Sequence, residues 1–222
     1  MSTVQSRSPV PILTFHQIAP EPQQGTGYRS LSVAPEHFAR QMALLKSLGF
    51  LGLSMTALQP YLRGERSGKV VGITFDDGYL NNLDHALPVL QQLGFSSTCY
   101  GISAMLGQTN SWDRHNKVPP TELMTPSQLR QWVAGGQEVG AHTRHHVRLT
   151  EVDAATARDE IALCKTELEQ LTGAAVNHFC YPYGLYTPEH VVMVGEAGYA
   201  TATTTQRSRC LTGDNLLELP RV

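Results

Sequence analysis

Short apolar runs alternate with longer stretches of mixed polarity along most of the chain. The runs that we predict to be strands lie at residues 10–15, 50–53, 69–75, 95–100, 138–141, 177–181, 199–203 and 216–219. In the stretches between them, apolar residues recur every three or four positions and predict helices at 35–48, 54–62, 83–93, 126–134, 153–171 and 188–197. This alternation is typical of an α/β domain on a parallel sheet. We therefore predict one α/β domain, a closed or nearly closed parallel barrel, with a doubly wound open sheet as the alternative.

Residues with special backbone preferences mark several helix ends. Thr125 and Pro126 are the residue types expected at an N-cap and at the first helical position. Gly94 and Gly173 stand where two of the predicted helices should stop. Residues 106–124 show no periodicity and are predicted to form a long loop of the kind that often shapes a site.

The composition fits one globular domain and argues against several kinds of partner. With 222 residues the chain is long enough to bury a sizeable core. Its 17 Lys and Arg against 19 Asp and Glu give a net charge of −2 without any run of like charge, which argues against nucleic acid or an anionic membrane as the main partner. The four cysteines have no C-x-x-C spacing, so we expect reduced, buried thiols rather than a zinc knuckle or a disulfide scaffold.

We expect residues 1–9 to be a flexible segment ahead of a domain at 10–222. This segment lacks the apolar stretch of about 7–15 residues that a secretory signal needs, and nothing later approaches the ~18 apolar residues of a membrane span. The expectation is a cytoplasmic protein without a membrane span, although a chain whose leader had been removed would look the same. The sequence indicates no particular oligomeric state.

Two adjacent carboxylates, Asp76 and Asp77, follow the apolar strand predicted at 69–75. The carboxyl ends of parallel strands are where α/β barrels place catalysis. Neighbouring side chains on an extended backbone point in different directions, so one carboxylate can bind a cation while the other handles protons. The alternative is an Asp-Asp-Gly turn with solvated carboxylates.

Two histidines, His142 and His146, follow the strand predicted at 138–141. Their spacing of four puts both imidazoles on one side of a helical turn, where they can reach one metal ion. Together with Asp77 they form a set of two imidazoles and one carboxylate, which leaves coordination positions open for water and substrate. The alternative is a pair of surface histidines.

A third candidate segment, Tyr181-Pro182-Tyr183-Gly184, follows the strand predicted at 177–181, and its proline favours an extended turn. Taken in order with Thr74-Phe75-Asp76-Asp77-Gly78 and His142-Thr143-x-x-His146, it resembles the motifs of the polysaccharide deacetylases with a NodB-homology domain, carbohydrate esterase family 4. The resemblance covers most of the chain. It implies a deformed (β/α)7 barrel and a metal-dependent hydrolase that removes N-acetyl groups from an N-acetylated amino sugar or glycan and releases acetate.

The resemblance also assigns roles to particular residues. It implies that Asp77, His142 and His146 hold one divalent ion and that Asp76 is the general base. Zinc suits these nitrogen and oxygen ligands best, with cobalt, nickel or iron as alternatives. The backbone N–H of Tyr183, beside Pro182 in the substrate-binding segment, would help the ion to stabilise the oxyanion.

Two departures from the family pattern concern the residues around the base. Cys180 stands where many members have an arginine that pairs with the base, and Arg221 is the first candidate to replace it, with Arg144 and Arg114 as alternatives. The late histidine that supplies the general acid is missing. The N-terminal segment that ends at His16 resembles the poly-N-acetylglucosamine deacetylase branch, in which a circularly permuted barrel brings the equivalent strand from the front of the chain. We therefore predict His16 as the general acid, the alternative being that it only caps the first strand.

The long predicted loop contains Trp112 and Asp113, which could stack on a sugar face and bind its hydroxyls, or simply pack. The sequence leaves two other functions open. One is a glycan- or metal-binding module without turnover, and the other is an amidohydrolase that acts on a small non-sugar amide.

Overall fold

A computed structural model describes residues 9–116 and 118–222 of the chain. Except for Pro9, the segment predicted to precede the domain lies outside the described residues. No helix in the described ranges is both long and apolar enough to cross a membrane.

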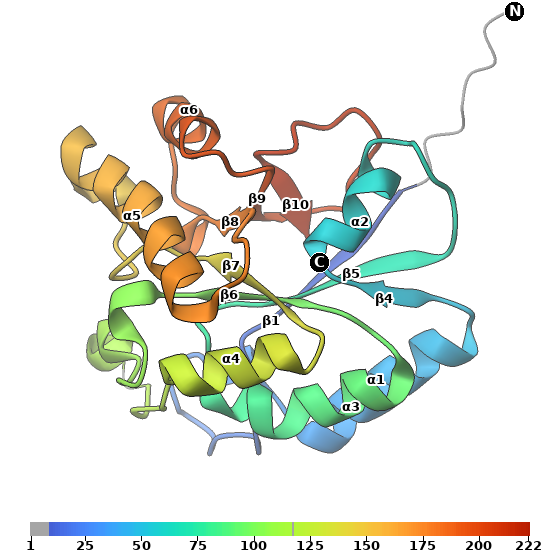
Figure 1. Ribbon diagram of the computed structural model, residues 1–222. Helices are drawn as coiled ribbons and strands as arrows, with labels where there is room; N and C mark the ends of the chain where they lie inside the picture. The colour runs from blue at the N-terminus through green and yellow to red at the C-terminus, as the bar shows by residue number, and fades with distance from the viewer. Residues whose placement is uncertain (1–8, 117) are drawn as a thin grey trace, which may run out of the picture.

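A curved parallel sheet forms the centre of the molecule (Figure 1). Its strands follow the order β1-β5-β6-β7-β8-β9-β10, and β4 pairs with the start of β5. Their bounds are β1 Ile12–Phe15, β4 Leu51–Leu53, β5 Val70–Phe75, β6 Thr98–Gly101, β7 Glu138–Ala141, β8 His178–Cys180, β9 Thr201–Arg207 and β10 Leu219–Arg221. Backbone hydrogen bonds of Val222 with Ile12 and Thr14, 2.8 and 3.0 Å long, join the two ends of the sheet. The predicted barrel is confirmed, and the open doubly wound sheet was the wrong alternative.

Helices surround this barrel (Figure 1), and the buried face of α2 packs into its inner apolar cluster. Their bounds are α1 Pro35–Ser47, α2 Met55–Leu62, α3 Leu87–Leu93, α4 Pro126–Ala134, α5 Ala154–Thr172 and α6 Pro188–Glu196. A capping box between Thr125 and Gln128 begins α4, and left-handed glycines at 94 and 173 end α3 and α5, as the sequence predicts.

Some boundaries differ from the prediction. A π-helical turn, Asn82–Ala86, precedes α3, where the leucine spacing predicts one continuous helix. The strand β9 extends to Arg207, and β10 begins three residues later than predicted, so that it includes Arg221. A two-residue strand pair, β2 (Gln17–Ile18) with β3 (Ser32–Val33), was not predicted. Short 3-10 turns lie at Arg29–Leu31, Ser103–Met105, Ser111–Asn116, Leu149–Glu151 and Pro182–Gly184.

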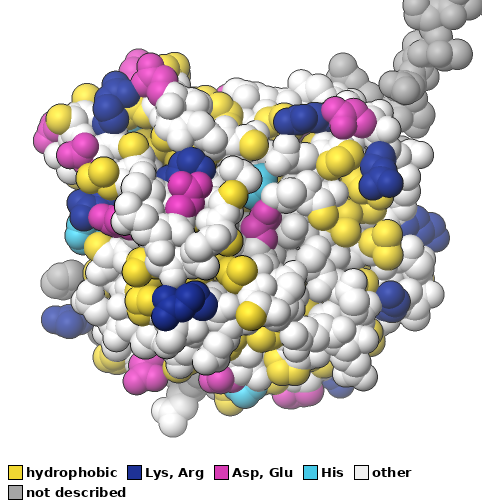
Figure 2. Space-filling view, in the orientation of Figure 1, with side chains coloured by type: hydrophobic (Ala, Val, Ile, Leu, Met, Phe, Trp, Pro, Cys, Tyr) yellow, Lys and Arg dark blue, Asp and Glu magenta, His cyan; other side chains and the backbone are white. Residues whose placement is uncertain are grey.

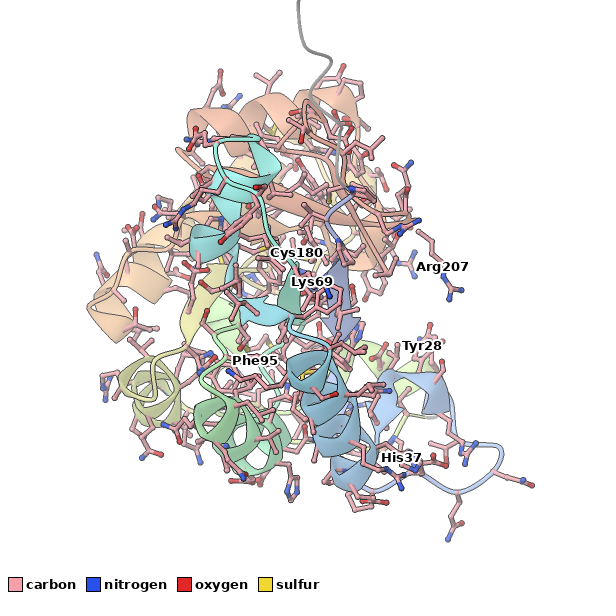
Figure 3. The ribbon with its side chains drawn as sticks, turned by 90° about the vertical axis from the view of Figure 1, so that its right-hand side faces the viewer. Tyr28, His37, Lys69, Phe95, Cys180 and Arg207 are labelled. Carbon is pink, nitrogen blue, oxygen red and sulfur yellow. The ribbon has the colours of Figure 1, made fainter. Side chains whose placement is uncertain are left out.

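Side chains of consecutive strand residues enter two different apolar cores. Cys99 and Phe179 pack outward against the helices, whereas Tyr100 and Cys180 belong to an inner cluster that includes Leu58 of α2. This alternation is the two-residue period of a strand. All four cysteines are buried and unpaired, as expected, and Cys180 lies among the strands in Figure 3. Where a strand ends on an outward-facing residue, the same period turns the next side chain towards the barrel axis. The candidate site residues lie at such positions.

Charged side chains are scattered over the face seen in Figure 2, and neither sign forms an extended patch there. This agrees with the net charge of −2 and the absence of like-charge runs in the sequence. It gives no support on this face to a polyanion as the partner.

Candidate active site

The candidate residues converge at the carboxyl ends of the barrel strands. Asp76 directly follows Phe75 at the end of β5, and His142 directly follows Ala141 at the end of β7. Phe75 and Ala141 both pack outward, so the next side chains turn to the barrel axis. His16 follows β1 at the same edge. This is the edge where parallel barrels carry their catalytic groups.

Asp77, His142 and His146 bring three ligand atoms to one point. Oδ1 of Asp77 lies 3.4 Å from Nε2 of His142 and 3.4 Å from Nε2 of His146. All three side chains are buried, and their ligand atoms lie within 4.8 Å of one another. Oδ1 of Asp77 is buried without a hydrogen-bond donor among the described residues. A buried, unsatisfied carboxylate oxygen facing two imidazole nitrogens fits a divalent ion that accepts nitrogen and oxygen ligands.

Contacts behind the two imidazoles fix which nitrogen faces this point. Nδ1 of His142 donates to the carbonyl oxygen of Cys180 over 2.7 Å, which leaves Nε2 free of its proton in the neutral ring. Nδ1 of His146 lies 3.1 Å from the Tyr183 hydroxyl. Such outer contacts orient metal-binding histidines and set their tautomer.

The backbone between the two histidines is a loop and not the helical turn that their spacing suggested. Thr143 and His146 have left-handed backbone, with φ of +63° and +57°. Asp77 and Tyr183 are also left-handed, so four of the five such non-glycine residues in the described ranges line this site. Backbone strain of this kind persists only where surrounding contacts hold it, and it gathers at functional sites.

The electrostatics hold two of the three groups, Asp77 and His146, in the forms that bind a cation. Burial would lower the pKa of the third group, His142, but its contacts with Cys180 and Asp77 more than offset burial and raise that pKa well above its usual range, so a bound cation must displace this proton. Burial alone would raise the pKa of Asp77, but the nearby imidazoles of His142 and His146 more than offset burial and hold that pKa below its usual range. Burial lowers the pKa of His146 to about 3, because attraction from Asp77 offsets only part of the loss of hydration and repulsion from His142 adds to it. At neutral pH the Asp77 carboxylate is therefore ionised and the His146 ring is neutral.

Asp76 is paired with Arg221 inside the barrel. Nη1 and Nη2 of Arg221 donate to Oδ1 and Oδ2 of Asp76, each over 2.7 Å, and the arginine is only 3% exposed. Burial would raise the pKa of Asp76, but attraction and hydrogen bonding from Arg221 hold it well below its usual range. Asp76 is thus ionised at neutral pH. Of the three arginines that the sequence offered, Arg144 pairs instead with Glu167, and Arg114 is exposed.

Cys180, at the position where the sequence resemblance leads one to expect an arginine, packs against Arg221. Sγ of Cys180 lies 3.1 Å from Nη2 of Arg221 and 3.6 Å from Oδ2 of Asp76. Asp76, His142 and Cys180 also have ligand-type atoms close together. The guanidinium already binds both oxygens of Asp76, so a cation is disfavoured there and the Asp77 cluster is the better metal site.

His16 lies beside Asp76 at the opening of the barrel. Its Nε2 is 3.8 Å from Oδ2 of Asp76, and its side chain is 24% exposed. The backbone carbonyl of His16 accepts a hydrogen bond from Asn82, but the hydrogen bonds found among the described residues include none from the His16 ring. The ring therefore lies beside Asp76, and no hydrogen bond found among the described residues caps β1 through it.

Aromatic side chains form one wall of the site. The rings of Trp112 and Tyr183 each lie 4.6 Å, centre to centre, from the ring of His146. Burial and the nearby Asp113 raise the pKa of Tyr183 to about 12, so its phenol stays neutral. The guanidinium of Arg148 lies 4.3 Å from the Tyr183 ring centre, a contact that no sequence motif indicated. Asp113 and Pro182, the neighbours of Trp112 and Tyr183 in the sequence, are also buried.

This fold and this site define a class: a barrel hydrolase with an arginine-paired carboxylate beside a centre suited to a divalent ion. The family model described as "Polysaccharide deacetylase" matches residues 63–202, which is more than half of the chain. The chain therefore belongs to the polysaccharide deacetylase family and is a deacetylase of the hydrolase class. Both His16 and Arg221 lie outside the matched residues.

Similar proteins support this assignment. YxkH of Bacillus subtilis (strain 168), whose name gives polysaccharide deacetylase as an inferred function, is 26% identical over 215 residues, which are 96% of this chain and 70% of that protein. The structure of the Streptococcus pyogenes deacetylase PplD in complex with acetate has a TM-score of 0.84 at 22% identity and covers 98% of this chain and 92% of that one. IcaB from Ammonifex degensii has a TM-score of 0.82 at 23% identity, with the same two coverages. These two structures share the fold.

Proposed function

We propose that this deacetylase removes N-acetyl groups from an N-acetylated amino sugar within an oligosaccharide or polysaccharide and releases acetate. The observation that carries the proposal is the position of an ionised, arginine-held carboxylate, Asp76, directly beside the Asp77–His142–His146 cluster. A site that only bound metal would have no use for the second carboxylate. That the related PplD is described in complex with acetate is in keeping with this product.

Asp77, His142 and His146 would hold the divalent ion, with zinc as the proposed species. When bound, such an ion supplies a Lewis acid for the acetamide carbonyl and lowers the pKa of a water molecule. Asp76 accepts the proton of the attacking water, and Arg221 keeps its carboxylate ionised for that purpose. The backbone N–H of Tyr183 has no acceptor among the backbone hydrogen bonds of the described residues, so it is free to donate to the developing oxyanion.

Collapse of the tetrahedral species breaks the carbon–nitrogen bond and requires a proton on the departing amine. We assign this proton to His16, because its ring lies at the opening of the barrel near Asp76 and belongs to no hydrogen bond found among the described residues. The products are acetate and the free amino sugar. Trp112 and Asp113 are proposed to contact the sugar next to the reacting acetamide.

Acetate release from an N-acetylglucosamine oligomer tests the proposal. We expect release with zinc present, none after chelation, and recovery when zinc is added back. The assay should include a simple acetamide without a sugar. A protein that binds the oligomer but releases no acetate would be a glycan-binding module, whereas one that cleaves only the simple amide would be a small-amide hydrolase, and either result contradicts the proposal.

His16→Ala is expected to slow turnover by about 10²–10⁴-fold, the usual contribution of a general acid, while zinc binding stays unchanged. Steady-state kinetics, together with metal analysis of the variant, check this. Near wild-type turnover with a full complement of metal would show that His16 is not the acid.

A further inference from the structure

The loop that carries the two proposed metal-binding histidines is held from behind by helix α5. This loop, residues 142–146, has left-handed backbone at Thr143 and His146 and cannot rely on the hydrogen bonds of a regular helix or strand. Its shape decides whether the two imidazoles meet Asp77. Contacts that fix the backbone between the two histidines therefore help to determine the geometry of the proposed metal site.

Glu160 of α5 makes the most extensive of these contacts. Its Oε2 accepts hydrogen bonds from two consecutive backbone amides, those of Arg144 and His145, each 2.9 Å long. Its Oε1 lies 2.6 Å from Nδ1 of His145. The side chain of Glu160 is only 7% exposed, so its carboxylate bonds to the loop and not to solvent.

The rest of the loop backbone is bonded as well. The thiol of Cys164, one helical turn beyond Glu160 on α5, donates to the carbonyl of Thr143 over 3.1 Å. The backbone amide of Ala104 donates to the carbonyl of Arg144 over 3.0 Å. Glu160 thus accepts the hydrogen bonds of the backbone N–H groups of this segment, while Cys164 and Ala104 donate to its backbone carbonyls.

We propose that Glu160 is a positioning residue for the metal centre. It contacts none of the three ligands through their side chains and acts by fixing the backbone between His142 and His146. Without it two buried amides lose their acceptor, the strained loop relaxes, and the two imidazoles no longer converge on Asp77. The inference rests on the proposed metal centre, but its test does not require catalysis.

Cobalt(II) binding to the purified protein tests this inference. Loss of an outer contact of this kind weakens metal binding by about 10–100-fold, and we expect that range for Glu160→Ala, with a changed visible absorption of the bound cobalt. Glu160→Gln keeps a carbonyl oxygen for both amides and should restore most of the affinity and the wild-type spectrum. Glu160→Asp withdraws the acceptor by one methylene and should behave like the alanine variant.

Glu169→Ala is the matched control. Glu169 lies on the same helix, and its carboxylate accepts from Lys165 and from the backbone amide of Val176, away from the histidine loop. Its removal should leave cobalt affinity and spectrum unchanged. If Glu160→Ala does not fold, the comparison of the Gln and Asp variants still decides the matter.

Two results would overturn the inference: wild-type affinity and spectrum in Glu160→Ala or Glu160→Asp, or equal losses in Glu160→Gln and Glu160→Ala. The outcome is separable from that of the proposed function. Wild-type protein that binds cobalt but releases no acetate would refute the proposed function and leave the role of Glu160 measurable. Wild-type protein that deacetylates while the Glu160 variants bind metal normally would refute only the positioning role.

Discussion

Asp76→Asn is expected to slow acetate release by about 10²–10⁴-fold, because the amide cannot accept the proton of the attacking water. The substitution keeps the size of the side chain and leaves one carbonyl oxygen for Arg221. Zinc affinity should therefore change little, since Asp76 is not among the three proposed ligands. Turnover of an N-acetylglucosamine oligomer, measured beside metal content, checks both parts.

Asp77→Asn distinguishes the role proposed for Asp77, metal binding, from the role proposed for Asp76. It removes the charge from the buried oxygen that faces both imidazoles, so we expect loss of bound zinc together with loss of activity. Equal rates for wild type and Asp76→Asn would refute the base assignment and, with it, the catalytic interpretation of the second carboxylate.

Arg221→Met is expected to cost about 3–5 kcal/mol of folding free energy, because it leaves the Asp76 carboxylate buried without its partner. Turnover should fall as well, since Asp76 would no longer be held in position and ionised. Arg207→Met is a suitable control: Arg207 pairs with Arg221 in the strand register but is exposed and extends away from the barrel (Figure 3). A surface change of this kind should stay within about 0.5 kcal/mol.

The same substitution should reverse how Asp76 contributes to stability across pH. In the wild type its folded-state pKa lies below the ordinary value of 3.8, so its contribution is complete above that value and is lost as the pH falls through the folded pKa. Without Arg221, burial raises the folded pKa above 3.8, and the contribution is then lost as the pH rises through it. Chemical denaturation should show that the folding free energy of Arg221→Met falls furthest below that of the wild type at pH 7 and that the difference narrows towards pH 4. A difference that stays constant with pH would contradict this.

The sequence was sufficient for features that depend on local chemistry. Strand ends bearing Asp76 and His142, the capping box at Thr125 and the left-handed Gly94 each follow from a short run of residues. The histidine spacing also indicated a shared ion. The helical turn inferred from that spacing was wrong, because Thr143 has a left-handed backbone that contacts from α5 stabilise and that no local preference of a β-branched residue would suggest.

For features that depend on the topology of the fold, the sequence could reduce the number of candidate residues but could not choose among them. The sequence offered three arginines for the base, and only the arrangement of strands shows that Arg221 on β10 meets Asp76, the residue after β5, inside the barrel. The role of Glu160 in shaping the loop is indicated in the sequence only by its place on a helix. Glu160 lies on the buried stripe of α5, between Ala157 and Cys164, and a glutamate in such a position needs buried donors.

The close packing of Cys180 against the guanidinium of Arg221 makes substitutions at these two positions interdependent. An arginine introduced at 180 would bring a second cation into a buried volume that already holds one, and the loss of Arg221 alone would leave the Asp76 carboxylate buried without its partner. The two changes together exchange one guanidinium for another. The folding free energies of the two single variants should therefore not add up, and the double variant should be more stable than their sum predicts.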